Sequence, residues 1–82
     1  MNWSVYILRC SDDSLYTGIT TDVERRVKEH NGESANLGAK FTRGRQPVKL
    51  VYQEKAASRS HATKREMEIK SLSRDLKLQL IN

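Results

Sequence analysis

Cysteine and proline each occur once in this chain, and its aromatic residues amount to one tryptophan, three tyrosines and one phenylalanine. The single cysteine, Cys10, excludes an internal disulfide and a metal cluster built from cysteine thiolates. Because Cys10 follows a run of apolar residues, we expect it to be a small core residue. No stretch approaches the roughly 18 apolar residues of a membrane span, and the sequence lacks a signal-peptide pattern. These absences predict a cytoplasmic protein without a membrane partner.

The length and composition of the chain suit one small globular domain. Its 82 residues lie at the low end of domain sizes, where folding buries only roughly 60–65% of the unfolded surface. Charged residues make up 30% of the sequence and hydrophobic residues 37%, a balance typical of globular and not of disordered proteins. We therefore expect a single domain over residues 1–82, acting as a monomer.

Positive charge is concentrated in the second part of the sequence. The whole chain carries a net charge of +5, but the stretch between Glu33 and Glu54 contains no acidic residue and four basic ones. Clustered lysines and arginines suit a polyanion, because phosphates that they neutralise release condensed counterions. The alternative is a basic surface that only keeps the protein soluble.

Hydrophobic patterning predicts a small α/β domain of the α+β type, with a three-stranded antiparallel sheet flanked by helices. The order is strand, strand, helix, strand, helix, helix. Thr21 and Glu24 have the spacing of a capping box at the start of the first helix. Ser58 or Ser60 is the expected cap of the second helix. The strands cover residues 3–10, 15–20 and 48–53, and the helices cover about 22–30, from 58 or 60 to 72, and from 73, with Leu76, Leu80 and Ile81 packing back.

A polar connection over residues 32–46 is long for a compact domain, and such loops usually bind something. Basic residues and one phenylalanine follow one another at its end. Phe41 either stacks on a base or packs in the core, and core packing is the favoured interpretation. The segment predicts a nucleic-acid interface formed by Lys40, Phe41, Thr42, Arg43 and Arg45.

Two charged side chains lie on the buried sides of the expected helices. Glu66 shares a narrow stripe with Ala62 and Ile69, where a carboxylate needs a cationic partner to offset its desolvation. On the first helix, Arg26 and His30 flank the apolar face. A structural ion pair between Glu66 and Arg26 and a functional role for both residues are the two interpretations that remain open at this point.

Five features together resemble the GIY-YIG endonuclease family: "VYI" at residues 5–7, "YTG" at residues 16–18, Arg26, His30 and Glu66. The longer segments resemble its small single-domain bacterial members, the YhbQ-like or UPF0213 group. Val5 stands where the first motif has glycine, and Thr17 stands where the second has isoleucine. Neither position supplies a reacting group.

The resemblance implies a metal-dependent endonuclease that hydrolyses phosphodiester bonds in DNA, either structure-specific or acting on single strands, with a role in DNA repair or processing. It implies that Glu66 binds one divalent cation, Mg²⁺ or Mn²⁺, that Arg26 contacts the scissile phosphate, and that Tyr6 and Tyr16 lie at the attacking water. His30 then orients the water or a tyrosine hydroxyl. DNA is the favoured partner and RNA is not excluded, with a protein partner to supply specificity. The alternative is a non-catalytic nucleic-acid-binding module with the same fold.

A shared site for Tyr6 and Tyr16 places a condition on the hairpin that joins them. A two-residue turn at Asp12 and Asp13 would pair Arg9 with Tyr16 and send the two phenols to opposite faces, because side chains alternate along a strand. We therefore predict an odd-length turn or a β-bulge near residues 10–15.

Overall fold

Three antiparallel strands form a sheet with β1 in the centre, in the order β2-β1-β3. The computed structural model describes residues 2–32 and 40–82. The predicted fold class and the order of elements are confirmed. The elements are β1 (Trp3–Arg9), β2 (Leu15–Thr20), α1 (Val23–His30), a short 3₁₀ turn η1 (Lys40–Thr42), β3 (Lys49–Ala56), α2 (Arg59–Lys70) and α3 (Arg74–Ile81).

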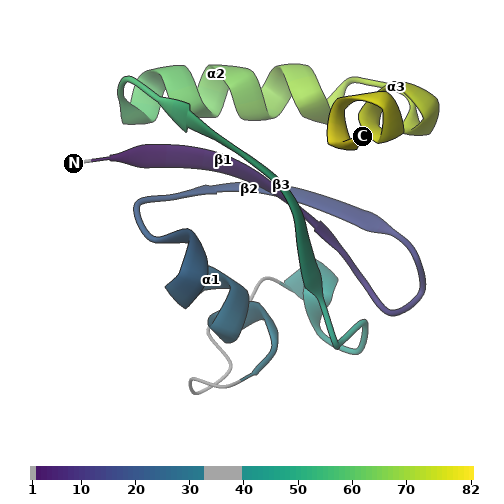
Figure 1. Ribbon diagram of the computed structural model, residues 1–82. Coiled ribbons are helices and arrows are strands. Elements are labelled where there is room, and N and C mark those ends of the chain that lie inside the picture. Colours follow the sequence, from purple (N-terminus) through teal and green to yellow (C-terminus); the bar gives the residue numbers. More distant parts are fainter. Residues whose placement is uncertain (1, 33–39) are drawn as a thin grey trace.

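Helices cover both faces of this sheet (Figure 1). Helix α1 lies on one face, and α2 and α3 lie on the other. Because β1 is sandwiched between them, all four residues from Val5 to Leu8 are buried, although strand side chains alternate between the two faces. No helix in the described part of the chain is both long and apolar enough to cross a membrane.

The alternation along β1 divides the core into two clusters. Val5 and Ile7 pack with Ala62 and Ile69 of α2, and Leu80 and Ile81 of α3 close this cluster as predicted. Leu76 is 47% exposed, so its predicted packing is wrong. The second cluster lies on the α1 face and contains Tyr6, Leu8, Val48 and Cys10, whose predicted burial is confirmed.

The hairpin between β1 and β2 has the predicted irregularity. Asp13 N donates to Cys10 O over 2.9 Å, and Cys10 N donates to Ser14 O over 2.9 Å, so three residues form the loop. Asp13 has a φ of +72°, the left-handed position that such a loop requires. Leu8 therefore pairs with Tyr16, and Tyr6 pairs with Gly18. The odd loop length brings Tyr6 and Tyr16 to the same face.

Helix α1 begins one residue later than the capping-box prediction. Asp22 is the N-cap, and its carboxylate accepts a hydrogen bond from Arg25 N at 3.1 Å. Thr20 Oγ1 accepts from Asp22 N at 3.1 Å and so holds the cap at the end of β2. The predicted box between Thr21 and Glu24 is wrong, because an aspartate in extended conformation takes the same capping role. Ser58 caps α2, one of the two predicted caps, and Ser73 caps α3.

The end of the long connection is fixed to the C-terminal end of α1. Asn31 makes two hydrogen bonds with Val48, one through Oδ1 at 2.7 Å and one through Nδ2 at 3.2 Å. Gln46 Nε2 donates to the backbone carbonyl of His30 at 2.6 Å. The turn η1 therefore lies beside α1, and residues 40–46 are not the structureless connection that the sequence predicts. The first part of the predicted connection, residues 33–39, lies outside the described residues.

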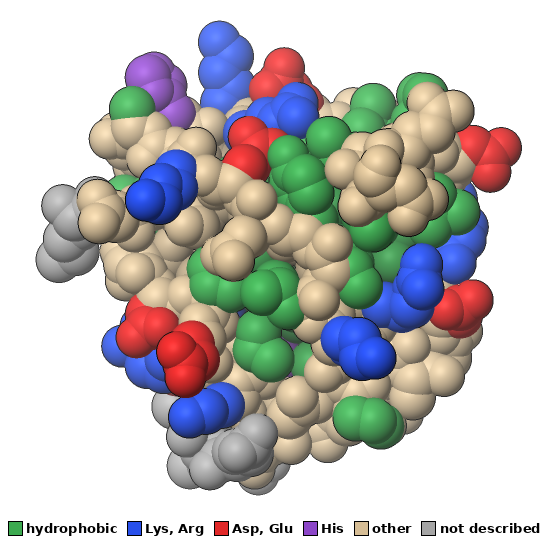
Figure 2. Space-filling view, in the orientation of Figure 1, with side chains coloured by type: hydrophobic (Ala, Val, Ile, Leu, Met, Phe, Trp, Pro, Cys, Tyr) green, Lys and Arg blue, Asp and Glu red, His purple; other side chains and the backbone are tan. Residues whose placement is uncertain are grey.

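Apolar side chains gather over the middle of the face on which β3 lies (Figure 2). An open groove of about 450 Å³ runs between α1 and β3, with Val23, Val27 and Leu50 at its floor. Val23 and Val27 are the two valines that mark the buried side of α1 in the sequence, and they pack against the second core cluster. The groove thus lies between helix α1 and the edge strand β3.

Candidate active site

Tyr6 and Tyr16 form the centre of the candidate site. Their ring centroids are 6.4 Å apart on the α1 face of the sheet. Tyr6 is only 1% exposed, whereas Tyr16 is half-buried. One phenol is thus held inside the fold, and the other is partly exposed to solvent.

Gly18 makes room for both rings. A Cβ atom at this position would lie 2.5 Å from the Tyr6 hydroxyl oxygen, 2.7 Å from Tyr6 Cζ and 3.1 Å from Tyr16 Cε2. Real Cβ atoms essentially never approach other atoms as closely as the two Tyr6 distances, and the Tyr16 distance is tighter than most real Cβ contacts. The glycine of the "YTG" motif is therefore required by the packing of the tyrosines and not by an unusual backbone conformation.

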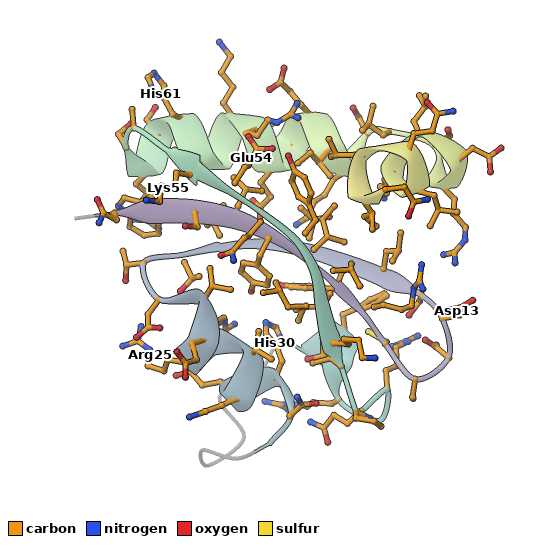
Figure 3. All side chains as sticks on the ribbon, viewed as in Figure 1. Asp13, Arg25, His30, Glu54, Lys55 and His61 are labelled. Atoms are coloured by element: carbon orange, nitrogen blue, oxygen red, sulfur yellow. The ribbon has the colours of Figure 1, made fainter. Side chains whose placement is uncertain are left out.

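His30 connects α1 to the phenols. Its Nε2 lies 2.9 Å from the Tyr6 hydroxyl, and its Nδ1 lies 2.8 Å from Thr42 Oγ1. Its ring centroid is 5.0 Å from that of Tyr16. Figure 3 shows His30 on the side of α1 that faces the sheet, while Arg25 points away. Burial and then the positive charge of Arg26 lower the pKa of His30 from 6.5 to about 4, so the ring is neutral at pH 7.

Tyr6 holds its proton at neutral pH. Burial, followed by the proximity of Tyr16, raises the pKa of Tyr6 to about 12, although Arg26 acts in the opposite direction through a hydrogen bond and its charge. The guanidinium of Arg26 also pairs with Glu29, with Nη1 2.9 Å from Oε1. Arg26 is only 25% exposed, whereas its neighbour Arg25 is 61% exposed, as the helical pattern predicts. Arg26 thus joins Tyr6 and His30 at one place.

Glu66 approaches from α2, which packs on the opposite face of the sheet. Its carboxylate is among the charges that raise the pKa of Tyr6, so it lies within electrostatic reach of that hydroxyl. This is possible because β2 is an edge strand that α2 contacts along with β1. Ala62 and Ile69 on the same helix are fully buried, while the Glu66 side chain is 19% exposed and remains accessible.

Lys70 is a neighbour of the site that the sequence interpretation missed. Its Nζ lies 3.5 Å from Glu66 Oε2 and 5.9 Å from the centroid of the Tyr16 ring. Its position one helical turn after Glu66 is the signal that was present in the sequence. The expected cationic partner of Glu66 is therefore this lysine.

The donor atoms around Glu66 define which metal ion would suit this position. Within residues 2–32 and 40–82, no three histidine, cysteine, aspartate or glutamate side chains come together as a complete metal site. One carboxylate suits a hard cation such as Mg²⁺, which keeps several waters and takes further ligands from a substrate phosphate. The available donors do not suit Zn²⁺, which requires three or four nitrogen, sulfur or carboxylate ligands from the protein.

Phe41 and Arg45 form one surface at the edge of the site. Phe41 is 38% exposed, so the favoured interpretation of it as a core residue is wrong. Its ring centroid lies 5.7 Å from that of Tyr16, and the Arg45 guanidinium carbon lies 4.3 Å from the Phe41 centroid. Arg45 also binds Asp12 Oδ2 at 3.0 Å and Phe41 O at 2.7 Å. Arg45 therefore holds the loop to the hairpin, and this engagement limits how freely it meets a phosphate.

The remaining members of the predicted interface differ from one another. Thr42 is fully buried against His30, so it does not offer its side chain to a nucleic acid, and this part of the prediction is wrong. Arg43 is exposed next to it. The side chain of Lys40 lies outside the part of the chain that the structure describes.

The GIY-YIG catalytic domain matches residues 2–80 of the sequence. The chain belongs to the GIY-YIG family. This membership places it in the nuclease superfamily of that name. A UPF0213 protein of Haloquadratum walsbyi is 63% identical over 93% of this chain and 82% of its own length. A UPF0213 protein of Staphylococcus haemolyticus is 56% identical over 94% of this chain and 90% of its own length.

Two solved structures resemble this member of the GIY-YIG family over nearly its whole length. The solution structure of a UPF0213 protein from Bacillus halodurans has a TM-score of 0.61 and 49% identity, covering 99% of this chain and 83% of its own. The solution structure of a protein from E. faecalis has a TM-score of 0.64 and 44% identity, covering 96% and 81%. Both the resemblance to the family and the fold that it implies are thus confirmed.

Proposed function

We propose that the protein is a metal-dependent endonuclease that hydrolyses phosphodiester bonds in DNA with little sequence preference. The observation that carries the proposal is the convergence of side chains on the Tyr6 hydroxyl. His30 hydrogen-bonds to it, Arg26 reaches it from the same helix, and Glu66 lies within electrostatic reach from another helix. The half-buried Tyr16 stands beside it, with the two ring centroids 6.4 Å apart.

These groups suit the requirements of phosphodiester hydrolysis, which are a basic nucleophile and neutralised phosphate charge. A divalent cation, Mg²⁺ or Mn²⁺, bound at Glu66 supplies charge neutralisation and a more acidic water. Arg26 carries a positive charge beside the two phenols and binds the scissile phosphate. His30 accepts the hydroxyl proton of Tyr6 in a hydrogen bond and so orients that hydroxyl.

Tyr6 is the proposed general base, with Tyr16 positioning the attacking water. The Tyr6 hydroxyl has both the imidazole and the guanidinium as neighbours. Its pKa of about 12 means that it cannot act as a base until additional positive charge enters the site. A divalent cation held by Glu66 would supply that charge, so we expect cleavage to require metal.

The basic second part of the chain provides the proposed contact with the nucleic acid. Phe41 offers an exposed ring at the edge of the site, and Arg43 lies exposed beside it. Stacking of a base on an aromatic ring contributes about 1–3 kcal/mol and does not depend on the base. This favours single-stranded or structurally distorted DNA, with sequence selection left to a protein partner in repair or processing.

A non-catalytic nucleic-acid-binding module is the second candidate. The ion pair between Glu66 and Lys70 favours it, because an ammonium group 3.5 Å from the Glu66 carboxylate would compete with a metal ion for that carboxylate. This candidate predicts binding without hydrolysis on every substrate.

Cleavage assays separate the two candidates. The protein is incubated with single-stranded, duplex and branched DNA and with RNA, in Mg²⁺, in Mn²⁺ and in chelator. Wild type should cleave only with metal, and Glu66→Gln should abolish cleavage while binding persists. Glu68→Gln is the matched control, since Glu68 is an exposed acid on the same helix. Binding without cleavage on every substrate, or equal cleavage by Glu66→Gln and wild type, would refute the proposal.

A further inference from the structure

Three buried side chains from three separate segments form a continuous hydrogen-bonded series. The series runs from Tyr6 on β1 through His30 on α1 to Thr42 on η1, with distances of 2.9 and 2.8 Å. All three residues are at most 1% exposed. The imidazole uses Nε2 for Tyr6 and Nδ1 for Thr42. In the neutral ring one of these nitrogens carries the proton and donates, so the other nitrogen must accept.

The neighbours of Tyr6 favour one direction for this series, and an acceptor opposite Nδ1 of His30 is needed to complete it. A guanidinium has only donors, so Arg26 can only donate to the Tyr6 oxygen. The phenol is neutral at pH 7 and has its own proton to donate, and His30 Nε2 lies 2.9 Å away in position to accept it. A neutral imidazole that accepts at Nε2 carries its proton on Nδ1, and Nδ1 then donates to Thr42 Oγ1.

The backbone around Thr42 holds its hydroxyl in place. Gln46 binds the carbonyl of His30, and Asn31 makes two hydrogen bonds with Val48, so the segment is fixed to the end of α1 on the far side of Thr42. Arg45 N also donates to Thr42 O at 3.1 Å. These contacts fix the position of Oγ1 opposite Nδ1 independently of any substrate.

We propose that Thr42 is a positioning residue, which keeps His30 in the Nδ1–H tautomer so that Nε2 holds the hydroxyl proton of Tyr6. As Tyr6 takes a proton from the attacking water, its own hydroxyl proton passes to Nε2 of His30. This role rests on the proposed nuclease function, but the tautomer itself does not. The positioning role replaces the contact with nucleic acid that the sequence predicts for Thr42.

The tautomer is measured on the protein without substrate or metal, by long-range ¹H–¹⁵N NMR of the His30 ring. Wild type should show a protonated Nδ1 and an unprotonated Nε2 at pH 7. Thr42→Val keeps the shape of the side chain but removes the acceptor, and it should shift the ring toward the Nε2–H form. Thr42→Ser should keep the wild-type tautomer. An Nε2–H tautomer in the wild type would overturn the proposal, even in a protein that cleaves DNA.

Cleavage kinetics test the consequence on an oligonucleotide that the wild type cleaves. Thr42→Val should lower kcat by about 10- to 100-fold, the range found when the partner that orients a metal-ligating imidazole is lost. KM should stay unchanged, because the side chain is buried away from the nucleic acid, and Thr42→Ser should restore kcat. Thr17→Val is the matched control. Thr17 is another buried threonine, and it lies on the face of β2 opposite to Tyr16. A rise in KM with constant kcat, or equal loss in the Val and Ser variants, would overturn the role.

A protein without cleavage activity would refute the proposed function alone, since the NMR measurement still decides whether Thr42 sets the tautomer. A normal tautomer in Thr42→Val would refute the positioning role alone. The two failures are therefore distinguishable.

Discussion

Replacing Gly18 with alanine tests whether the two tyrosines are packed as tightly as the structure indicates. The new methyl group would lie 2.5 Å from the Tyr6 hydroxyl oxygen and 3.1 Å from a Tyr16 ring carbon. Tyr6 cannot move into solvent, because it is 1% exposed and its hydroxyl is bound to His30. The substitution must therefore displace a buried ring.

The size of the effect follows from two opposing contributions. Overpacking a well-packed core costs about 1–3 kcal/mol. Alanine in place of glycine in a strand gives back about 0.5–1 kcal/mol, because it restricts the unfolded chain. Since the displaced ring is rigid and buried, we expect the cost to prevail, with a net loss of about 1–2 kcal/mol in the free energy of unfolding. For a chain of this size such a loss lowers Tm by roughly 4–16 °C.

Urea unfolding and cleavage are measured together on Gly18→Ala. Gly44→Ala is a suitable control, because Gly44 has a φ of +76° and no atoms near its would-be Cβ. It should lose stability through backbone strain while its cleavage activity persists. Gly18→Ala should lose both. A Tyr6→Phe change should cost less in the Gly18→Ala background than in wild type, with a coupling of at least about 0.5 kcal/mol. A Gly18→Ala protein as stable and as active as wild type would refute this reasoning.

Three further predictions concern charge. His30 takes up a proton near pH 6.5 in the unfolded state and near pH 4 in the folded state. The neutral ring therefore contributes its full stabilisation above about pH 6.5, and the free energy of unfolding falls by up to about 3 kcal/mol as the pH drops to 4. Urea unfolding measured against pH should show a flatter profile in His30→Gln. Lys70→Met should tighten Mn²⁺ binding to the free protein, measured by calorimetry, because it removes the ammonium 3.5 Å from Glu66; equal affinity would contradict this competition. Arg43→Gln should weaken binding to a single-stranded oligonucleotide and reduce its salt dependence by about one unit of slope, which is checked by repeating the titration at several salt concentrations.

The sequence predicts much of this fold, because strands and helices are determined by residues that are close together in the chain. The apolar alternation of β1 and the buried positions Ala62 and Ile69 of α2 follow from strand and helix periodicity. The odd hairpin loop is predicted from chemistry instead, because a shared site needs Tyr6 and Tyr16 on one face. By contrast, Thr21 and Asp22 are both good caps at adjacent positions. The choice between them depends on where β2 ends, which the sequence does not encode locally.

The site is harder to predict, because its details depend on contacts between distant segments. The burial of Thr42 results from the bonds that fix residues 46–48 to the end of α1, and no periodicity describes such a loop. Arg45 is predicted to face phosphates, yet its stacking on Phe41 and its bond to Asp12 depend on the hairpin lying next to the loop. The approach of Glu66 to Tyr6 requires α2 to run beside an edge strand, and sheet order is a property of the whole fold.

The three-residue loop of the β1–β2 hairpin also limits which changes of length this family member can accept. Gaining or losing one residue between Arg9 and Leu15 would reverse the orientation of every later side chain of β2 and turn Tyr16 to the side on which α2 lies. Two residues can be added or removed together without that reversal. Homologous hairpins that keep both phenols in one site should therefore differ in length by even numbers, or carry a compensating bulge.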